Sequence, residues 1–376
     1  MTKKLLFLTG TRADYGKLKT LLHAVEKSEK YECYIFATGM HTLSKYGYTV
    51  EEIVKEGFKN IHVYMNQIQG EPMDLILANT VGGLSRYVQE CQPNMIIVHG
   101  DRVEAMAGAI VGALNNILVA HIEGGEHSGT IDGLIRHATS KMSHLHFVAN
   151  DEASILLQQM GEDPQSIYAI GSPDIDVMLS NDLPTLEAVK QRYDIPFDHY
   201  GIVMFHPVTT EVHRLKEDAE TLVDALIESG REYVVIYPNN DEGSGLIFQA
   251  YERLKGNERF KLYPSLRFEY FLTLLKYSDF IVGNSSAAIR EAPVYGVYSI
   301  DLGTRQKQRF EYESILNTAI DKQRILDRIQ LVSDLKRCQP CFTFGRGNSA
   351  ALFMDALEEE RLWDTPKQKE FKSLRS

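Results

Sequence analysis

The chain has 376 residues, a length that fits two domains of ordinary size. Its hydrophobic content of 44% and charged content of 24% are typical of a globular protein, and its net charge of −11 argues against binding nucleic acid through the phosphate backbone. There is no apolar run approaching the roughly 20 residues needed to cross a membrane, and the first apolar run begins too early for a signal peptide. We therefore expect a cytoplasmic protein with no membrane and no nucleic-acid partner.

Short apolar runs alternate with amphipathic segments along most of the chain. In the first half these runs begin at residues 3, 31, 60, 94, 116, 144 and 166, and segments such as 103–114 and 152–160 have helical spacing. The polar, proline-containing stretch 180–200 interrupts the pattern, which resumes with runs beginning at residues 201, 231, 259, 278 and 297. The alternation predicts an α/β fold with two doubly wound, mostly parallel sheets.

We expect the two Rossmann-like domains to cover residues 1–180 and 200–376, with the last helix a candidate to pack back on the first domain. Ligands in such sheets bind at the carboxyl ends of the strands, so two facing domains predict a central cleft.

The segment LTGTRADYGKLK follows the first apolar run and contains two glycines and a lysine. A Walker loop needs four residues between its glycines and Ser or Thr after the lysine. Here five residues separate Gly10 from Gly16, and Leu18 follows Lys17, so the triphosphatase interpretation fails. A strand, a glycine turn and a helix remain, which is a general way to present backbone amides to an anion.

Carboxylates follow two neighbouring predicted strands. Asp101 and Arg102 come directly after one buried run, and Glu123 and Asp132 follow the next. Paired carboxylates suit acid–base chemistry, because one must accept a proton while another donates. Any one of them has an alternative role as a helix cap, Asp132 above all, but three at one predicted sheet edge favour function.

The sequence predicts neither a metal nor a redox cofactor. His121, Glu123 and His127 lack the i, i+4 spacing of a metalloprotease pair, and the C-x-x-C of Cys338 and Cys341 stands alone. No G-x-G-x-x-G fingerprint is present, which leaves a nicotinamide dehydrogenase without support.

In the second half, Ser285 and Ser286 follow an apolar run and begin an expected helix, where hydroxyls and free amides suit a phosphate. Glu291 lies about one turn later, in reach of a ribose hydroxyl, although a serine N-cap is the alternative interpretation. His206, Asn239 and Arg305 also each follow a predicted strand.

Taken in order, these motifs resemble those of the UDP-N-acetylglucosamine 2-epimerase family, specifically its hydrolysing branch that starts sialic acid synthesis. The match runs from GTRADYGKLK through VHGDR, HIEGGEHSGTID, GSPDID, MFHPVTTE, YPNND and GNSSAAIREAP to GTRQ at residues 303–306. The resemblance implies two domains of the glycosyltransferase-B type, a homodimer, and a UDP-sugar substrate and UDP product in the cleft.

By position, the resemblance also implies roles for individual residues. The implied catalytic residues are Asp101, Glu123 and Asp132 as acid–base carboxylates, Asp176 as a fourth carboxylate, and His206 beside the leaving diphosphate. The implied substrate and UDP contacts are Arg12, Arg102, His206, Asn239, Ser285, Ser286, Glu291 and Arg305. Which carboxylate removes a proton and which returns one stays open.

The chain departs from the non-hydrolysing relatives, which carry GTRPE at residues 10–14 and HRRE at residues 206–209. Arginines used there for a second nucleotide sugar are missing, which favours hydrolysis of UDP-GlcNAc to N-acetylmannosamine and UDP. The alternatives are UDP-N,N′-diacetylbacillosamine as the substrate for legionaminic acid, a glycosyltransferase of the same architecture, and a catalytically silent nucleotide-sugar sensor.

Overall fold

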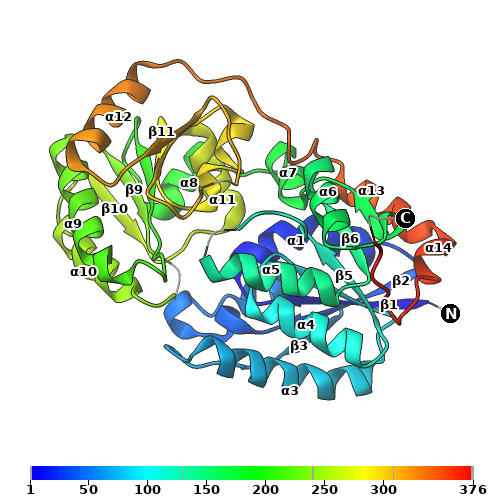
Figure 1. Cartoon of the computed structure of the whole chain (residues 1–376). Coiled ribbons are helices and arrows are strands. Elements are labelled where there is room, and N and C mark those ends of the chain that lie inside the picture. The colour runs from blue at the N-terminus through cyan, green and yellow to red at the C-terminus, as the bar shows by residue number, and fades with distance from the viewer. Residues whose placement is uncertain (1, 129, 239–240, 308, 374–376) are drawn as a thin grey trace. The chain divides into compact units, whose positions relative to one another are not determined.

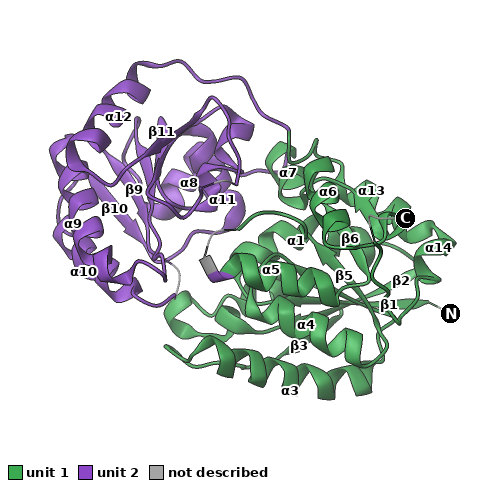
Figure 2. Ribbon diagram, viewed as in Figure 1, with its two compact units in different colours: residues 1–128, 132–180, 343–376 green, residues 129–131, 181–342 purple. Residues whose placement is uncertain are grey.

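The computed structural model describes residues 2–128, 130–238, 241–307 and 309–373 (Figure 1). The chain divides into two compact units, of which the first contains residues 1–128, 132–180 and 343–376 and the second residues 129–131 and 181–342 (Figure 2). The chain therefore leaves the first unit near residue 180 and returns to it near residue 343.

Within the described residues, the first unit contains a seven-stranded parallel sheet of order β3-β2-β1-β4-β5-β6-β7. Its strands are β1 (Lys3–Thr9), β2 (Tyr31–Ala37), β3 (Asn60–Val63), β4 (Met95–His99), β5 (Leu118–Ile122), β6 (Leu145–Val148) and β7 (Ile167–Ala169). The chain runs outward from β1 in one direction and from β4 in the other. The switch point of this Rossmann order, where ligands bind in such sheets, therefore lies between β1 and β4.

Helices cover both faces of this sheet. They are α1 (Arg12–Glu26), α2 (Val50–Lys55), α3 (Met73–Cys91), α4 (Val103–Leu114), α5 (Thr130–Met142), α6 (Asp151–Gln159), α7 (Pro173–Leu179), α13 (Ser349–Glu358) and α14 (Glu360–Trp363). Successive side chains of β1 point to opposite faces of the sheet, because side chains alternate along a strand. Leu5 and Phe7 belong to the core cluster beneath α1 and α13, and Leu6 and Leu8 to the one beneath α3 and α4.

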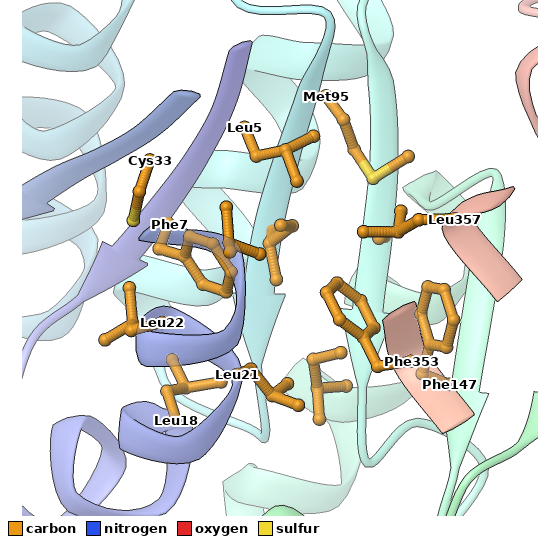
Figure 3. Close-up of a cluster of buried hydrophobic side chains, with 14 of the residues drawn as sticks. Leu5, Phe7, Leu18, Leu21, Leu22, Cys33, Met95, Phe147, Phe353 and Leu357 are labelled. Atoms are coloured by element: carbon orange, nitrogen blue, oxygen red, sulfur yellow. The ribbon is translucent and has the colours of Figure 1, made fainter. Parts of the chain in front are cut away.

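The cluster beneath α1 and α13 joins the two ends of the chain (Figure 3). The ring of Phe353 on α13 lies edge-on to that of Phe147 on β6, with centroids 4.8 Å apart. Leu357, one turn after Phe353, is also buried in this cluster. Helix α13 is therefore a structural part of the first unit.

The second unit repeats the pattern with a six-stranded parallel sheet of order β10-β9-β8-β11-β12-β13 in the part of the chain that is described. Its strands are β8 (Gly201–Met204), β9 (Tyr233–Ile236), β10 (Phe260–Tyr263), β11 (Phe280–Gly283), β12 (Tyr298–Leu302) and β13 (Ile315–Thr318). Its α-helices are α8 (Leu186–Tyr193), α9 (Val212–Glu228), α10 (Ser244–Tyr251), α11 (Phe268–Tyr277) and α12 (Lys322–Asp334). Its switch point lies between β8 and β11.

The α/β class with two parallel sheets, predicted from the alternation of elements, is confirmed. Three local features differ from the prediction. The stretch expected to join the halves contains α8, which packs against α11, and the edge strand β13 was not predicted. The helix expected after β11 consists of two 3₁₀ turns, η5 (Ser286–Ala288) and η6 (Ala292–Tyr295). Pro293 explains this last difference, because it lacks an amide hydrogen and its ring clashes with the carbonyl four residues earlier in an α-helix.

Among the described residues, no helix combines the length and apolar character required to span a lipid bilayer.

Candidate active site

The predicted site residues form two groups, one at the carboxyl edge of each sheet and near its switch point. The first group follows β1, β4 and β5, and the second follows β8, β11 and β12; Asp176, on α7 after β7, and Asn239, which is not described, belong to neither. Each group is described within its own unit.

Arg136, on α5, joins the loops that follow β4 and β5. Its Nη2 donates to the Asp101 carboxylate, its Nη1 donates to the backbone carbonyl of Glu123, and its Nε donates to Ser128 Oγ at 2.7 Å. Ser128 Oγ in turn donates to Asp101 Oδ2 at 2.8 Å. The guanidinium is buried, at 3% exposure for the residue, so it fixes the carboxylate of Asp101 relative to the backbone of Glu123.

Glu123 has an unusual backbone conformation for a residue with a side chain, with a φ of 60°. Such left-handed conformations cost free energy outside glycine and persist where neighbouring groups hold them, often at functional sites. Its carboxylate is buried, accepts a hydrogen bond from Ser172 Oγ, and lies 3.2 Å from Nε2 of His99. The carboxylate is thus held at the end of β5, next to the strand that leads to Asp101.

Asp132 lies in the first turn of α5, which begins at Thr130, so it is not the residue that immediately precedes the helix. Asp132 precedes Arg136 by four residues, and residues with this spacing share one face of a helix. The structure therefore places Asp132 on the same helix face as the arginine that holds Asp101.

His121 has a structural role between β5 and α5. It is fully buried, its Nε2 donates to the Gly100 carbonyl at 2.8 Å, and its Nδ1 accepts from Ser140 Oγ at 3.0 Å. Burial lowers the pKa of His121 to about 3, so its imidazole is neutral at physiological pH. In the described part of the chain, no group of His, Cys, Asp or Glu side chains is arranged to hold a metal ion.

The turn after β1 differs from the expectation that its amides bind an anion. The amides of Gly10 and Thr11 donate to the carboxylate of Asp14 at 3.0 and 3.2 Å, and Thr11 Oγ1 accepts from the Asp14 amide at 3.1 Å. This reciprocal capping box uses those two amides within the protein. For these two amides the prediction is wrong, because the anion they bind is the carboxylate of Asp14.

The two predicted arginines of the first unit both lie beside carboxylates. Arg12 Nη2 is 2.7 Å from Oε1 of Glu52, and both side chains are about one-fifth exposed. Arg102 is the N-cap residue of α4, and its Nε lies 3.5 Å from Oε2 of Glu104.

Asp176, expected as a fourth catalytic carboxylate, has structural partners. Its two oxygens accept the amides of Ser349 and Ala350, both at 2.8 Å, and so bind the first turn of α13. Burial raises the pKa of Asp176, against a smaller opposite effect of those amides. These contacts support a capping role.

We expect Asp176→Ala to lower the free energy of unfolding by about 1–2 kcal/mol, the usual value of a helix cap. Urea denaturation measures this loss, and the folded fraction should bind UDP as tightly as the wild type. A kcat that falls while the free energy of unfolding stays constant would show that Asp176 takes part in catalysis.

In the second unit, Asn284 links the ends of β8 and β11. Its side chain accepts the His206 amide at 2.7 Å and donates to the His206 carbonyl at 2.9 Å. Its own carbonyl accepts from Nη1 of Arg305 at 3.1 Å and from Nε2 of Gln306 at 2.7 Å. Asn284 therefore brings two predicted residues, His206 and Arg305, to one edge of the sheet, although it was not itself predicted.

The other predicted residues of this unit lie in the turns after β11. Ser285 is the N-cap of η5, with its Oγ accepting the Ala287 amide at 3.3 Å, and the buried Glu291 precedes η6. Because η5 is a single 3₁₀ turn, the expected dipole of a long helix is absent here. Asn239 lies outside the described residues.

Acidification should destabilise the fold through two histidines. Burial lowers the pKa of His121 and, together with Arg305, that of His206 to about 3, against 6.5 in the unfolded chain. Below pH 6.5 the unfolded state binds protons at both sites that the native state does not, so the free energy of unfolding falls by up to about 1.4 kcal/mol per pH unit for each.

Protonation of Asp301 raises the free energy of unfolding as the pH falls from 6 to 4, because burial raises the pKa of its carboxyl to about 6. The raised pKa values of Asp176 and Asp218 add to this effect. Burial also lowers the pKa values of His41, His144 and His146, so a net loss on acidification remains. Urea denaturation from pH 7 to pH 4 measures it, and a free energy of unfolding that stays constant over this range would contradict the expectation.

Known proteins resemble this chain along most of its length. The sequence model of the family described as UDP-N-acetylglucosamine 2-epimerase matches residues 23–358. The chain is 48% identical over 375 residues to the UDP-N-acetylglucosamine 2-epimerase of Neisseria meningitidis serogroup B, covering 99% of each chain. It is 30% identical over 354 residues to the UDP-N,N′-diacetylbacillosamine 2-epimerase (hydrolyzing) of Legionella pneumophila, covering 93% of this chain and 94% of that one.

Solved structures agree in fold. The UDP-GlcNAc 2-epimerase from Neisseria meningitidis bound to UDP-GlcNAc gives a TM-score of 0.79 at 17% identity, covering 94% of this chain and 99% of that one. The Methanocaldococcus jannaschii enzyme in complex with UDP-GlcNAc and UDP gives 0.81 at 22% identity with the same coverage. By the family match and the extent of the sequence identity, this chain is a member of the UDP-N-acetylglucosamine 2-epimerase family.

Proposed function

We propose that the protein is a hydrolysing 2-epimerase that converts UDP-GlcNAc and water to N-acetylmannosamine and UDP, the first step of sialic acid synthesis. The observation that carries the proposal is the pair Asp101 and Glu123, held by Arg136 at the ends of adjacent strands. Adjacent parallel strands lie about 4.8 Å apart, so carboxylates on the residues that follow them can act on neighbouring atoms of one substrate.

In the first step the bond between C1 of the sugar and the diphosphate oxygen breaks. The C2 proton is not acidic enough to be removed first, so bond cleavage runs ahead and leaves oxocarbenium character at C1. Positive groups beside the diphosphate stabilise the leaving UDP, and Arg12 and Arg305 are the candidates. A carboxylate then takes the C2 proton, and the product is 2-acetamidoglucal.

In the second step water adds to C1 of the glycal while a proton returns to C2 from the opposite face. The result is N-acetylmannosamine, with C2 inverted. This step needs a second acid–base group, and Asp101, Glu123 and Asp132 are the three candidates for the two roles. His206, neutral because of its low pKa, fits a hydrogen bond to the diphosphate better than an ion pair with it.

Hydrolysis rather than reversible epimerisation is favoured by residues 206–209, which are His206, Pro207, Val208 and Thr209. Non-hydrolysing members carry arginines here for a second nucleotide sugar. The proposal needs neither a metal nor another cofactor. Its homodimer rests on the family resemblance alone, and its cytoplasmic location is the expectation drawn from the sequence.

Proton NMR of the purified protein with UDP-GlcNAc in deuterated water tests the proposal. The expected products are UDP and free N-acetylmannosamine that carries deuterium at C2. UDP-ManNAc as the product would mean epimerisation without hydrolysis and would refute the hydrolysing assignment.

UDP-N,N′-diacetylbacillosamine is a second candidate substrate, because a relative with 30% identity is a hydrolysing epimerase of that sugar. The 48% identity to a UDP-N-acetylglucosamine 2-epimerase favours UDP-GlcNAc. Comparison of kcat/KM for the two nucleotide sugars decides between them.

Replacing both Ser285 and Ser286 by Ala should weaken UDP binding by a factor of about 10 or more, because hydrogen bonds to a charged group contribute about 1.5–3 kcal/mol. Calorimetric titration with UDP measures the change. Ser333→Ala, which removes a hydroxyl from α12 of the same unit, is the matched control. An unchanged UDP affinity in the double variant would exclude the two serines from the UDP site.

A further inference from the structure

Ser172 lies where three parts of the first unit meet. Its backbone amide donates to the Phe344 carbonyl at 2.6 Å, its backbone carbonyl accepts from Ser349 Oγ at 3.1 Å, and its Oγ donates to the carboxylate of Glu123. The residue is fully buried. Its side chain therefore contacts a proposed catalytic carboxylate while its backbone is fixed by a distant part of the chain.

That distant part is the returning segment, residues 343–349, by which the chain re-enters the first unit. It packs closely on the start of α7, the helix through which the chain leaves. A Cβ built on Gly171 would lie 3.1 Å from Cα of Gly345, and one built on Gly345 would lie 3.2 Å from the Ser172 amide nitrogen. Both glycines have positive φ, of 83° and 149°, so the close approach depends on residues without side chains.

Glu123 needs external support because its backbone is strained. Its carboxylate accepts a hydrogen bond from the Ser172 hydroxyl and lies 3.2 Å from Nε2 of His99. The hydroxyl bond fixes one carboxylate oxygen, and with it the direction in which the other oxygen faces. A shift of about 1 Å in a catalytic group lowers turnover by a factor of about 100.

We propose that Ser172 is a positioning residue for Glu123 and that the returning segment keeps Ser172 in place. This inference rests on the proposed function, in which Glu123 transfers a proton to or from the sugar. Loss of the hydroxyl leaves UDP binding intact, because the UDP contacts of that proposal lie elsewhere. It slows the proton transfer that Glu123 performs. Where that transfer is the return of a proton to C2, the glycal waits longer and escapes into solution more often.

The wild type is assayed first for release of N-acetylmannosamine, and no release would refute the proposed function itself. Ser172→Ala is then compared with the wild type. In Ser172→Ala we expect kcat to fall by a factor of about 10–100. We also expect the UDP affinity to stay within about twofold. A larger share of 2-acetamidoglucal among the products would assign the return of the C2 proton to Glu123, and an unchanged share would assign its removal. Ser166→Ala is the matched control, because it removes another buried serine hydroxyl of the first unit, bonded to the Asp163 carbonyl at 2.7 Å.

A second variant, Gly345→Ala, displaces the returning segment without changing Ser172. It should also lower kcat at unchanged UDP affinity, whereas Gly256→Ala, at a positive φ with open space around it, should not. The inference is overturned if Ser172→Ala keeps kcat within about twofold of the wild type, or if UDP affinity falls in parallel with kcat.

Discussion

Asp101→Asn is expected to lower kcat by a factor of about 10³, because positioned acid–base groups contribute about 10²–10⁴ to turnover. Asparagine has nearly the same shape and can still accept hydrogen bonds from Ser128 and Arg136, but it neither takes up nor releases a proton at neutral pH. The fold and the UDP affinity should therefore remain close to those of the wild type.

Release of UDP measures kcat for Asp101→Asn, and calorimetric titration measures UDP binding. Asp355→Asn, the same change at an exposed position of α13, is the control for loss of one negative charge in the same unit. Loss of UDP binding together with turnover would show that Asp101 supports the structure of the site and does not transfer protons.

Arg136→Met is expected to lower both stability and turnover. Removing one partner of a buried ion pair costs about 3–5 kcal/mol, and the lower end applies here because the Asp101 side chain is 25% exposed and can be hydrated. The change also removes the guanidinium link between the loops after β4 and β5, which then stay connected through the hydrogen bond from Ser128 to Asp101. We expect kcat to fall by a factor of about 100 through misplacement of Asp101 and Glu123.

Urea denaturation and steady-state kinetics measure these two losses, with Arg324→Met on the exposed surface of α12 as the control. The double variant Asp101→Asn, Arg136→Met separates coupling from independent effects. If the pair interacts as the structure indicates, the double variant loses less stability than the sum of the single losses. Strict additivity would show that the arginine stabilises the fold without acting through Asp101.

The sheets and the loop carboxylates could be predicted because they depend on local sequence. Apolar runs give the strands, and the loop after a strand in a doubly wound sheet lies at the ligand edge, which singled out Asp101 and Glu123. Arg136 and Ser172 were not predicted as site residues, since they lie 35 and 49 residues from the carboxylates that they contact. Such pairs are set by tertiary packing, which a single sequence does not reveal.

The role of Asp14 had a sequence signal. Thr11 and Asp14 have the spacing of a capping box before an apolar helix, a pattern that predicts bonded amides in the turn. For Asn284 and Asp176 no comparable signal exists, because their partners are backbone groups of the β8 end and of α13.

The path of the chain through its two units has a consequence for biosynthesis. Protein domains generally fold as they emerge from the ribosome, the N-terminal one first. Here the first unit lacks Phe353 and Leu357 until the second unit has been synthesised, so the apolar surface that α13 covers stays open while the second unit is already complete. The unit that begins synthesis first is therefore finished after the other, and the growing chain depends on α13 to close the core around Phe147.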